Sequence, residues 1–264
     1  MYTRKKVRQG KKRMLLVLEL ILIISFLCLL VILVHRLSAT RRIADEENSA
    51  GTMYEHIATE LEESQSNTAL EHGSVQPEIK ELMEQNSDAV GLLHFDGDRT
   101  LYVCQTIDNR YYMTHRFDKS EDPAGMIYMD YRNSLWPRSE NLILYGHNMR
   151  DGSRFGTLKR FENVDHMVEH PIFQLVERYE TVDYIPIAIF HTTAVPDDSN
   201  YYAFDRINFA DENDFNQYIR DVKSRSIIDI PASAVYGDKL LTLATCYSGQ
   251  EHGRLVIVCR EVIN

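Results

Sequence analysis

Two residues near the C-terminus, Cys246 and Arg254, have the types and positions needed for acyl transfer. Cys246 follows an apolar run, residues 240–244, and Arg254 directly precedes another, residues 255–259. If the two runs are neighbouring strands, a thiol and a guanidinium lie side by side at their open ends. A thiolate can attack a carbonyl carbon, and a fixed cation stabilises the resulting oxyanion. Arginine keeps its proton and therefore also favours the charged form of the thiol.

The alternative for Cys246 is an inert cysteine of the core, since cysteine is among the most buried residue types. Against this, the residues that follow it, YSGQEHG at 247–253, are typical of a turn. The chain has four cysteines, of which Cys28 lies in an N-terminal apolar segment. The other three are an odd number, so at least one of them forms no intramolecular disulfide. We interpret Cys104 and Cys259, which lie in apolar runs, as buried thiols.

His147 is the candidate proton carrier. An apolar run at residues 141–145 leads into Gly146 and His147, and Asp151 and Gly152 then indicate a turn. A free imidazole titrates near neutral pH, which suits a general acid or base. The chain has ten histidines, so a surface or structural role is the alternative for any of them. His252 is close to Cys246 in sequence and is the main rival as the base.

Short apolar runs separated by turns must position these groups, and they predict a β-barrel. The expected strands are residues 90–95, 101–105, 126–129, 142–145, 172–176, 181–191, 239–244 and 255–260. Eight short strands with few helices favour a closed or nearly closed barrel, hence a mainly β fold. Helices are expected at residues 78–85, after Pro77, and at 155–161, 166–169 and 211–224; the last is amphipathic.

The N-terminus carries a membrane signal. Residues 14–34 are apolar apart from Glu19, and seven basic residues precede them. About 20 apolar residues span a bilayer as a helix, and the positive flank predicts a cytoplasmic N-terminus. A cleaved signal peptide is the alternative, but its apolar core is shorter. We expect a cytoplasmic tail at residues 1–13, a transmembrane helix at 14–34, an extracellular stalk at 35–74 and a catalytic domain at 75–264.

Charge and spacing exclude other functions. The chain has a net charge of −10 although its first 13 residues include seven basic ones, so the expected outer domain is strongly acidic. Such an acidic domain is a poor binder of nucleic acids, because their phosphates are negatively charged. His166, His170 and the other histidines lack a metal spacing such as HExxH, and Asp96, Gly97 and Asp98 predict a turn. We therefore expect no cofactor, no metal and no nucleic acid partner.

The motifs around the three candidate residues resemble those of the sortase family. TLATC at residues 242–246, followed by Arg254, resembles the TLxTC…R signature of sortases, and YGHNM at residues 145–149 with the following DG and Phe155 looks like the class B form. Further segments that resemble the family are residues 90–93, 102–105, 108–115 and 125–133, so the likeness covers about residues 75 to 264. Ala244 is a departure, because class B members commonly carry serine there.

This resemblance implies a sortase-type eight-stranded β-barrel and a membrane-anchored cysteine transpeptidase. Cys246 would attack the threonine carbonyl of a C-terminal sorting signal on a secreted surface protein. His147 would act as acid and base, and Arg254 would steady the substrate or the oxyanion. A peptidoglycan precursor or another amine would then resolve the thioester, which joins the surface protein to the cell wall.

The resemblance also suggests which residues bind substrate. These are Asn109, Met113, Thr245 and Tyr247, with the Tyr247 backbone N–H available to the oxyanion. Asn109 and Met113 have an alternative role as ordinary turn and core residues. Two alternatives to the transpeptidase remain open: a membrane-tethered cysteine protease that passes its acyl group to water, and a sortase-like domain that binds without turnover.

Overall fold

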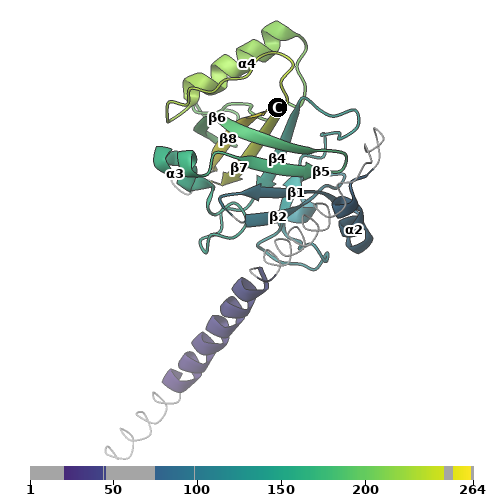
Figure 1. The fold of residues 1–264 in the computed structure, drawn as a ribbon. Coiled ribbons are helices and arrows are strands. Elements are labelled where there is room, and N and C mark those ends of the chain that lie inside the picture. Colours follow the sequence, from purple (N-terminus) through teal and green to yellow (C-terminus); the bar gives the residue numbers. More distant parts are fainter. Residues whose placement is uncertain (1–20, 44, 46–74, 98, 247–251, 263–264) are drawn as a thin grey trace, which may run out of the picture. The chain divides into compact units, whose positions relative to one another are not determined.

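Eight strands close into a barrel in a computed structural model, which describes residues 21–43, 45, 75–97, 99–246 and 252–262 (Figure 1). The order around the barrel is β1-β2-β3-β4-β7-β8-β6-β5, and β5 pairs with β1 to complete it. The strands are β1 (Ala89–Phe95), β2 (Arg99–Cys104), β3 (Ile127–Met129), β4 (Asn141–Gly146), β5 (Phe173–Glu177), β6 (Thr181–Thr193), β7 (Leu240–Cys246) and β8 (Gly253–Glu261).

Strand β7 lies between two partners that run in different directions. It pairs in parallel with β4, with Gly146 opposite Thr245, and antiparallel with β8, with Cys246 opposite Arg254. The β2–β3 pair is also parallel, and the other neighbours are antiparallel. The end of β4 and the end of β7 therefore meet the start of β8 at one edge of the barrel.

Strands β7 and β8 are buried on both faces along most of their length. The barrel interior holds aromatic rings, including stacked Phe95 and Phe173, whose centroids are 5.7 Å apart. Outside the barrel, helix α4 (Glu212–Arg225) packs Phe215 and Tyr218 against strand residues such as Phe190. A strand that is covered on both sides carries apolar residues on both faces, which explains why β7 and β8 are largely apolar instead of alternating.

The helices follow local signals. Asp211 caps α4 by accepting a hydrogen bond from Asp214 N, and Asn163 caps α3 (Val164–Glu169) in the same way. Helix α2 (Pro77–Gln85) starts at a proline, which suits the first helical turn. The described part of the chain also contains two 3₁₀ helices, η1 (Tyr111–Met113) and η2 (Leu158–Glu162).

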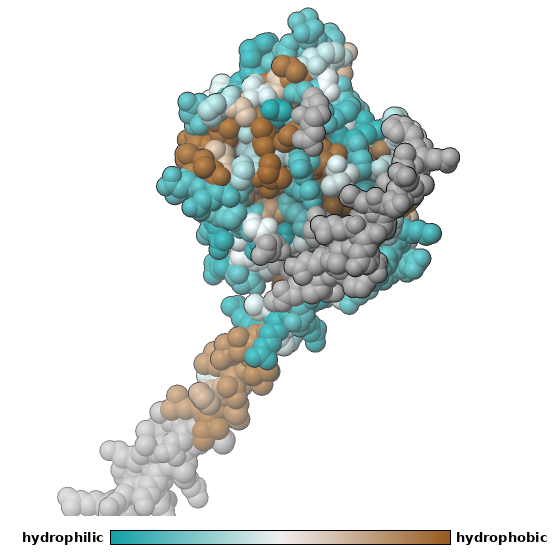
Figure 2. Space-filling view, in the orientation of Figure 1, coloured by the Kyte–Doolittle hydropathy of each residue, from teal (hydrophilic) through white to brown (hydrophobic). Residues whose placement is uncertain are grey.

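A separate N-terminal unit contains an apolar helix. Residues Ile21–Ile43 form one helix whose apolar window has a mean hydropathy of 2.5, long enough to cross a membrane. Figure 2 shows hydrophobic residues along much of this helix. The chain divides into two compact units, Met1–Glu46 and Glu47–Asn264. The basic tail, Glu19 and most of the expected stalk lie outside the described residues, so the proposed domain boundaries stay predictions.

Most of the expected elements are confirmed, including all eight strands and the barrel. One helix differs: residues 155–157 precede η2 instead of belonging to it. The backbone there makes three-residue turns, with Gly156 N donating to Ser153 O and Leu158 N to Phe155 O, so the chain does not start an α-helix. Cys104 and Cys259 are buried and form no disulfide with another described cysteine, as expected.

The buried link between the starts of β4 and β7 provides a stability test. Thr242 Oγ1 donates to Asn141 Oδ1 at 2.9 Å, and both residues are fully buried. Thr242→Val removes the donor and leaves a buried amide oxygen without it, so we expect a loss of about 1–3 kcal/mol in unfolding free energy. Urea denaturation of the detergent-solubilised chain measures it. Exposed Thr114→Val serves as the control and should change stability little; equal losses in both variants would contradict this role for the link.

Candidate active site

Cys246 and Arg254 face each other across two antiparallel strands. They are directly opposite in the β7–β8 register, so both side chains lie on the same face of the sheet. The Cys246 thiol is exposed, whereas the rest of β7 is buried. Arg254 Nη1 donates to the carbonyl oxygens of Gly253 at 3.0 Å and His252 at 3.3 Å. These two bonds occupy one end of the guanidinium and fix its orientation.

His147 follows β4 and reaches the same place from the other side of β7. Its Nε2 lies 2.8 Å from the Met113 carbonyl oxygen. If Nε2 carries the proton donated to this oxygen, Nδ1 is the nitrogen available to the Cys246 thiol. The His147 and Cys246 side chains both line one pocket, and each shifts the pKa of the other. The neighbouring strands thus bring an imidazole and a guanidinium to opposite sides of one sulfur.

The surroundings favour a charged pair. The hydrogen bond from His147 lowers the pKa of Cys246 and overcomes burial, which raises it; the charge of Arg254 lowers it further. In the same way, the hydrogen bond to Cys246 raises the pKa of His147 against burial, and the Met113 carbonyl adds to the rise. Because the two pKa values move toward each other, the thiolate–imidazolium form gains population around neutral pH.

A pocket of about 190 Å³ opens over these three side chains. Its walls include Tyr128 and Tyr145, whose rings are 5.4 Å apart. Burial raises the pKa of Tyr128 to about 12, so its hydroxyl keeps its proton at neutral pH. The remaining lining residues are Asn109, Met113, Gly146, Ala244 and Thr245. The pocket combines a nucleophile, a proton carrier and a fixed cation with largely apolar walls.

Hydrogen bonds hold the loop after β4 against β7. Asn148 Nδ2 donates to the Cys246 carbonyl oxygen at 2.8 Å, and Thr245 Oγ1 donates to the Gly146 carbonyl oxygen at 2.7 Å. Gly146 has no room for a side chain, because an added Cβ would lie 2.3 Å from Ile127 Cδ1 and 2.9 Å from the Phe155 ring. The glycine therefore lets His147 start its loop close to the barrel wall.

Asp130 organises the far side of the pocket. Its buried carboxylate accepts hydrogen bonds from Asn109 Nδ2 at 3.1 Å, Tyr145 Oη at 3.0 Å and the Arg132 guanidinium at 2.8 Å. Asn109 Oδ1 in turn accepts from Tyr131 N at 2.9 Å. The Asn109 amide is thus oriented by both of its ends, and Tyr145 is held in place by its hydroxyl.

The structure brings together six of the seven residues predicted for the site. Cys246, His147, Arg254, Asn109, Met113 and Thr245 all line the pocket. Tyr247 lies outside the described residues. His252, the rival base, is not among the lining residues; its backbone oxygen contacts Arg254 instead.

Three residues of the site were missed by sequence reasoning. Asn148 directly follows His147, and a polar amide next to a candidate base was a usable signal. Tyr128 in β3 lies directly opposite Tyr145 in β4. Nothing in the spacing of the two tyrosines indicated that β3 joins β4 at this edge of the barrel.

Comparisons with known proteins agree with this geometry. Residues 98–262 match the family model of the sortase domain. Sortase B of Listeria monocytogenes serovar 1/2a is 32% identical over 189 residues, which cover 70% of this chain and 74% of that protein. Sortase B of Staphylococcus aureus is 26% identical over 254 residues, covering 96% of this chain and 98% of that protein.

Solved structures share the fold. The Staphylococcus aureus sortase B–substrate complex superposes with a TM-score of 0.72 at 22% identity, covering 84% of this chain and 97% of that one. Sortase B from Bacillus anthracis in complex with AAEK1 superposes with a TM-score of 0.71 at 25% identity, covering 86% and 100%. Because the family model spans more than half of the chain and a relative exceeds 30% identity, this chain belongs to the sortase family, with sortase B proteins among its relatives.

Proposed function

We propose that this sortase cleaves a C-terminal sorting signal after threonine and transfers the surface protein to a cell-wall amine through a thioester on Cys246. Sortases act as cell-wall transpeptidases, and this chain has the sortase domain. The observation that supports the finer assignment is the meeting of Cys246, His147 and Arg254 in one pocket. The proposal requires no cofactor.

In the first half of the reaction, the Cys246 thiolate attacks the threonine carbonyl carbon. The carbonyl electrons move to oxygen, and a tetrahedral oxyanion forms. The Arg254 guanidinium, held by two backbone carbonyls, is placed to stabilise that charge or the substrate backbone. His147 gives its proton to the departing amine nitrogen, the C–N bond breaks, and an acyl thioester remains on Cys246.

In the second half, an amine replaces the leaving peptide. His147, now neutral, removes a proton from the attacking amine, whose nitrogen bonds to the thioester carbon. The C–S bond breaks and the thiolate returns beside the imidazolium. The lowered pKa of Cys246 makes the sulfur a good leaving group as well as a populated nucleophile.

The pocket walls are the proposed substrate contacts. Asn109, Met113 and Thr245 line the pocket, and Asn109 has an amide oriented by Asp130 and Tyr131. We add the Tyr247 backbone N–H as an oxyanion donor. Tyr128 and Tyr145 provide apolar surface for the side chains of the sorting signal. A solved protein with the same fold is a Staphylococcus aureus sortase B–substrate complex, and this supports a substrate-binding role for the fold.

The proposed location follows from the N-terminal helix. An apolar helix at Ile21–Ile43 fits a single-pass membrane anchor, and the basic residues ahead of it favour a cytoplasmic N-terminus. The catalytic domain would then lie outside the cell, where sorting signals of secreted proteins and peptidoglycan amines are both present.

A cysteine series tests the nucleophile. Cys246→Ala should lower cleavage of a sorting peptide more than about a thousandfold, because no covalent intermediate can form. Cys104→Ala and Cys259→Ala, which replace buried thiols, are the controls and should keep most of the activity. Mass spectrometry of products with an added amine distinguishes transfer from hydrolysis. A dead Cys259→Ala variant with a normal melting curve would move the site elsewhere, and water as the sole acceptor would identify a protease.

Replacing Arg254 tests whether its guanidinium must hold two oxygens at once or only supplies a positive charge. A guanidinium can hold two oxygens at once, whereas an ammonium cannot. We expect Arg254→Lys to lower turnover at least about a hundredfold, as the loss of an oxyanion donor does. Its thiol alkylation rate and melting temperature should change little, since the charge remains. Near-normal turnover in Arg254→Ala would remove arginine from the mechanism.

The pH dependence of thiol alkylation tests the ion pair. His147 is the largest cause of the lowered pKa of Cys246, so His147→Ala should move the alkylation profile to higher pH, toward the ordinary thiol value of about 8.5. Iodoacetamide rates between about pH 5 and 9 measure the shift. His252→Ala is the matched control, since it truncates the rival base and should leave the profile in place. A shift in His252→Ala alone would reverse the assignment.

A further inference from the structure

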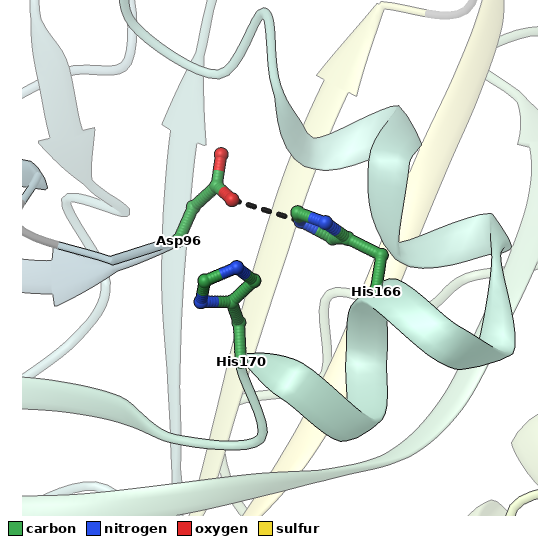
Figure 3. A group of neighbouring side chains, drawn as sticks. All are labelled: Asp96, His166 and His170. Carbon is green, nitrogen blue, oxygen red and sulfur yellow. Dashed lines mark ion pairs between the residues drawn. The ribbon is translucent and has the colours of Figure 1, made fainter.

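Asp96, His166 and His170 bring three potential metal donors together outside the active-site pocket (Figure 3). Asp96 directly follows β1, whereas His166 lies in α3 and His170 caps the end of that helix. One donor atom from each side chain lies within 4.8 Å of the other two. None of the three lines the pocket that contains Cys246. The acyl-transfer chemistry therefore leaves this cluster without an assigned role.

Asp96 is held firmly in the cluster. Its side chain is only 2% exposed, and its Oδ1 lies 2.8 Å from His166 Nε2. Its backbone has a φ of 56°, a left-handed conformation that non-glycine residues adopt infrequently, and Gly97 continues the turn with a φ of 84°. The other carboxylate oxygen lies 3.4 Å from Arg160 Nη1, an arginine whose side chain is 59% exposed. The oxygen beside His166 remains directed into the cluster.

The buried position of His166 Nε2 also indicates a ligand. This nitrogen is buried from solvent, yet it makes no hydrogen bond, although Asp96 Oδ1 is within ion-pair distance. The short separation therefore brings the two atoms together without the alignment that a proton shared between them needs. The Phe161 ring packs on His166 edge-to-face at 5.0 Å and restrains it. A lone pair on Nε2 can instead bind a cation that also contacts Asp96 Oδ1.

We propose that Asp96, His166 and His170 bind a divalent transition-metal ion, with Zn²⁺ the best match. Two imidazoles and one carboxylate are a donor set that Zn²⁺ accepts, with a water completing four ligands. Ca²⁺ and Mg²⁺ prefer six or more oxygens, which this cluster lacks. Donors around tetrahedral Zn²⁺ lie roughly 3.4 Å apart, as bond lengths of about 2.1 Å require. The present separations reach that value with side-chain shifts of about an ångström.

The ion would join two segments that are distant in sequence. It would link the turn after β1 to helix α3, which the Asp96–His166 ion pair already joins. Just after this turn, Arg99, the first residue of β2, donates from Nη1 to the Gly152 carbonyl oxygen at 2.7 Å, in the loop that follows His147. Metal binding should therefore stabilise the folded domain, since an ion that binds only the native state shifts unfolding upward.

Titration of the full-length, untagged protein with Zn²⁺ tests the proposal. All samples carry Cys246→Ala, because the thiol and His147 of the active site could themselves bind the metal. We expect one equivalent of Zn²⁺ by calorimetry, with a Kd below about 10 μM, in the range that corresponds to roughly −7 kcal/mol. Co²⁺ should give the visible absorption of a four-coordinate site, and Zn²⁺ should raise the melting temperature.

Ligand variants locate the bound ion. His166→Ala, His170→Ala and the isosteric Asp96→Asn should each weaken Zn²⁺ binding at least tenfold and abolish the rise in melting temperature. His191→Ala is the matched control: this histidine pairs with Glu162 at 3.1 Å, but the described residues give that pair no third donor. It should bind Zn²⁺ like the parent. Absence of stoichiometric binding, or equal binding by parent and Asp96→Asn, would overturn the proposal.

Discussion

The register of β7 is the constraint on which the site depends. A single strand hydrogen-bonds in parallel to β4 and antiparallel to β8, so its last residue meets the end of one neighbour and the start of the other. A slip of one residue between β7 and β8 would put Cys246 and Arg254 on opposite faces, and a slip between β4 and β7 would change the position of Cys246 relative to the end of β4. Burial of β7 on both faces and the Thr242–Asn141 hydrogen bond hold this register. The geometry of the candidate site is thus a product of backbone pairing.

Electrostatics then act on a geometry already fixed by the barrel. His147 and Arg254 flank one sulfur, and each cation lowers the pKa of the thiol against the opposing effect of burial. Neighbouring groups keep these side chains in place. The Met113 carbonyl contacts His147, Asn148 bonds to the Cys246 backbone, and two backbone carbonyls hold the Arg254 guanidinium. The histidine's own pKa rises with the same hydrogen bond, so the two charges depend on each other.

How much the sequence could predict varies with the range of the contacts. The sequence predicted these strands because two-sided burial makes β7 and β8 largely apolar, and the motifs predicted the positions of Cys246, His147 and Arg254. Neither the parallel β4–β7 pairing nor the meeting of Tyr128 with Tyr145 follows from short-range patterns, since both depend on strand order in space. The helix expected at 155–161 begins only at Leu158, because buried Phe155 belongs to the preceding turn.

The parallel pairing of β4 with β7 also has a consequence for the timing of biosynthesis. Thr245 bonds to Gly146 across 99 residues of chain, so this contact cannot form until nearly the whole domain has been synthesised. Contacts of such long sequence separation form slowly, because loop closure must precede them. A chain interrupted before residue 253 has the thiol but neither the β8 partner nor Arg254. Emerging chains therefore lack the Cys246–Arg254 pair until β8 has been made and the barrel closes.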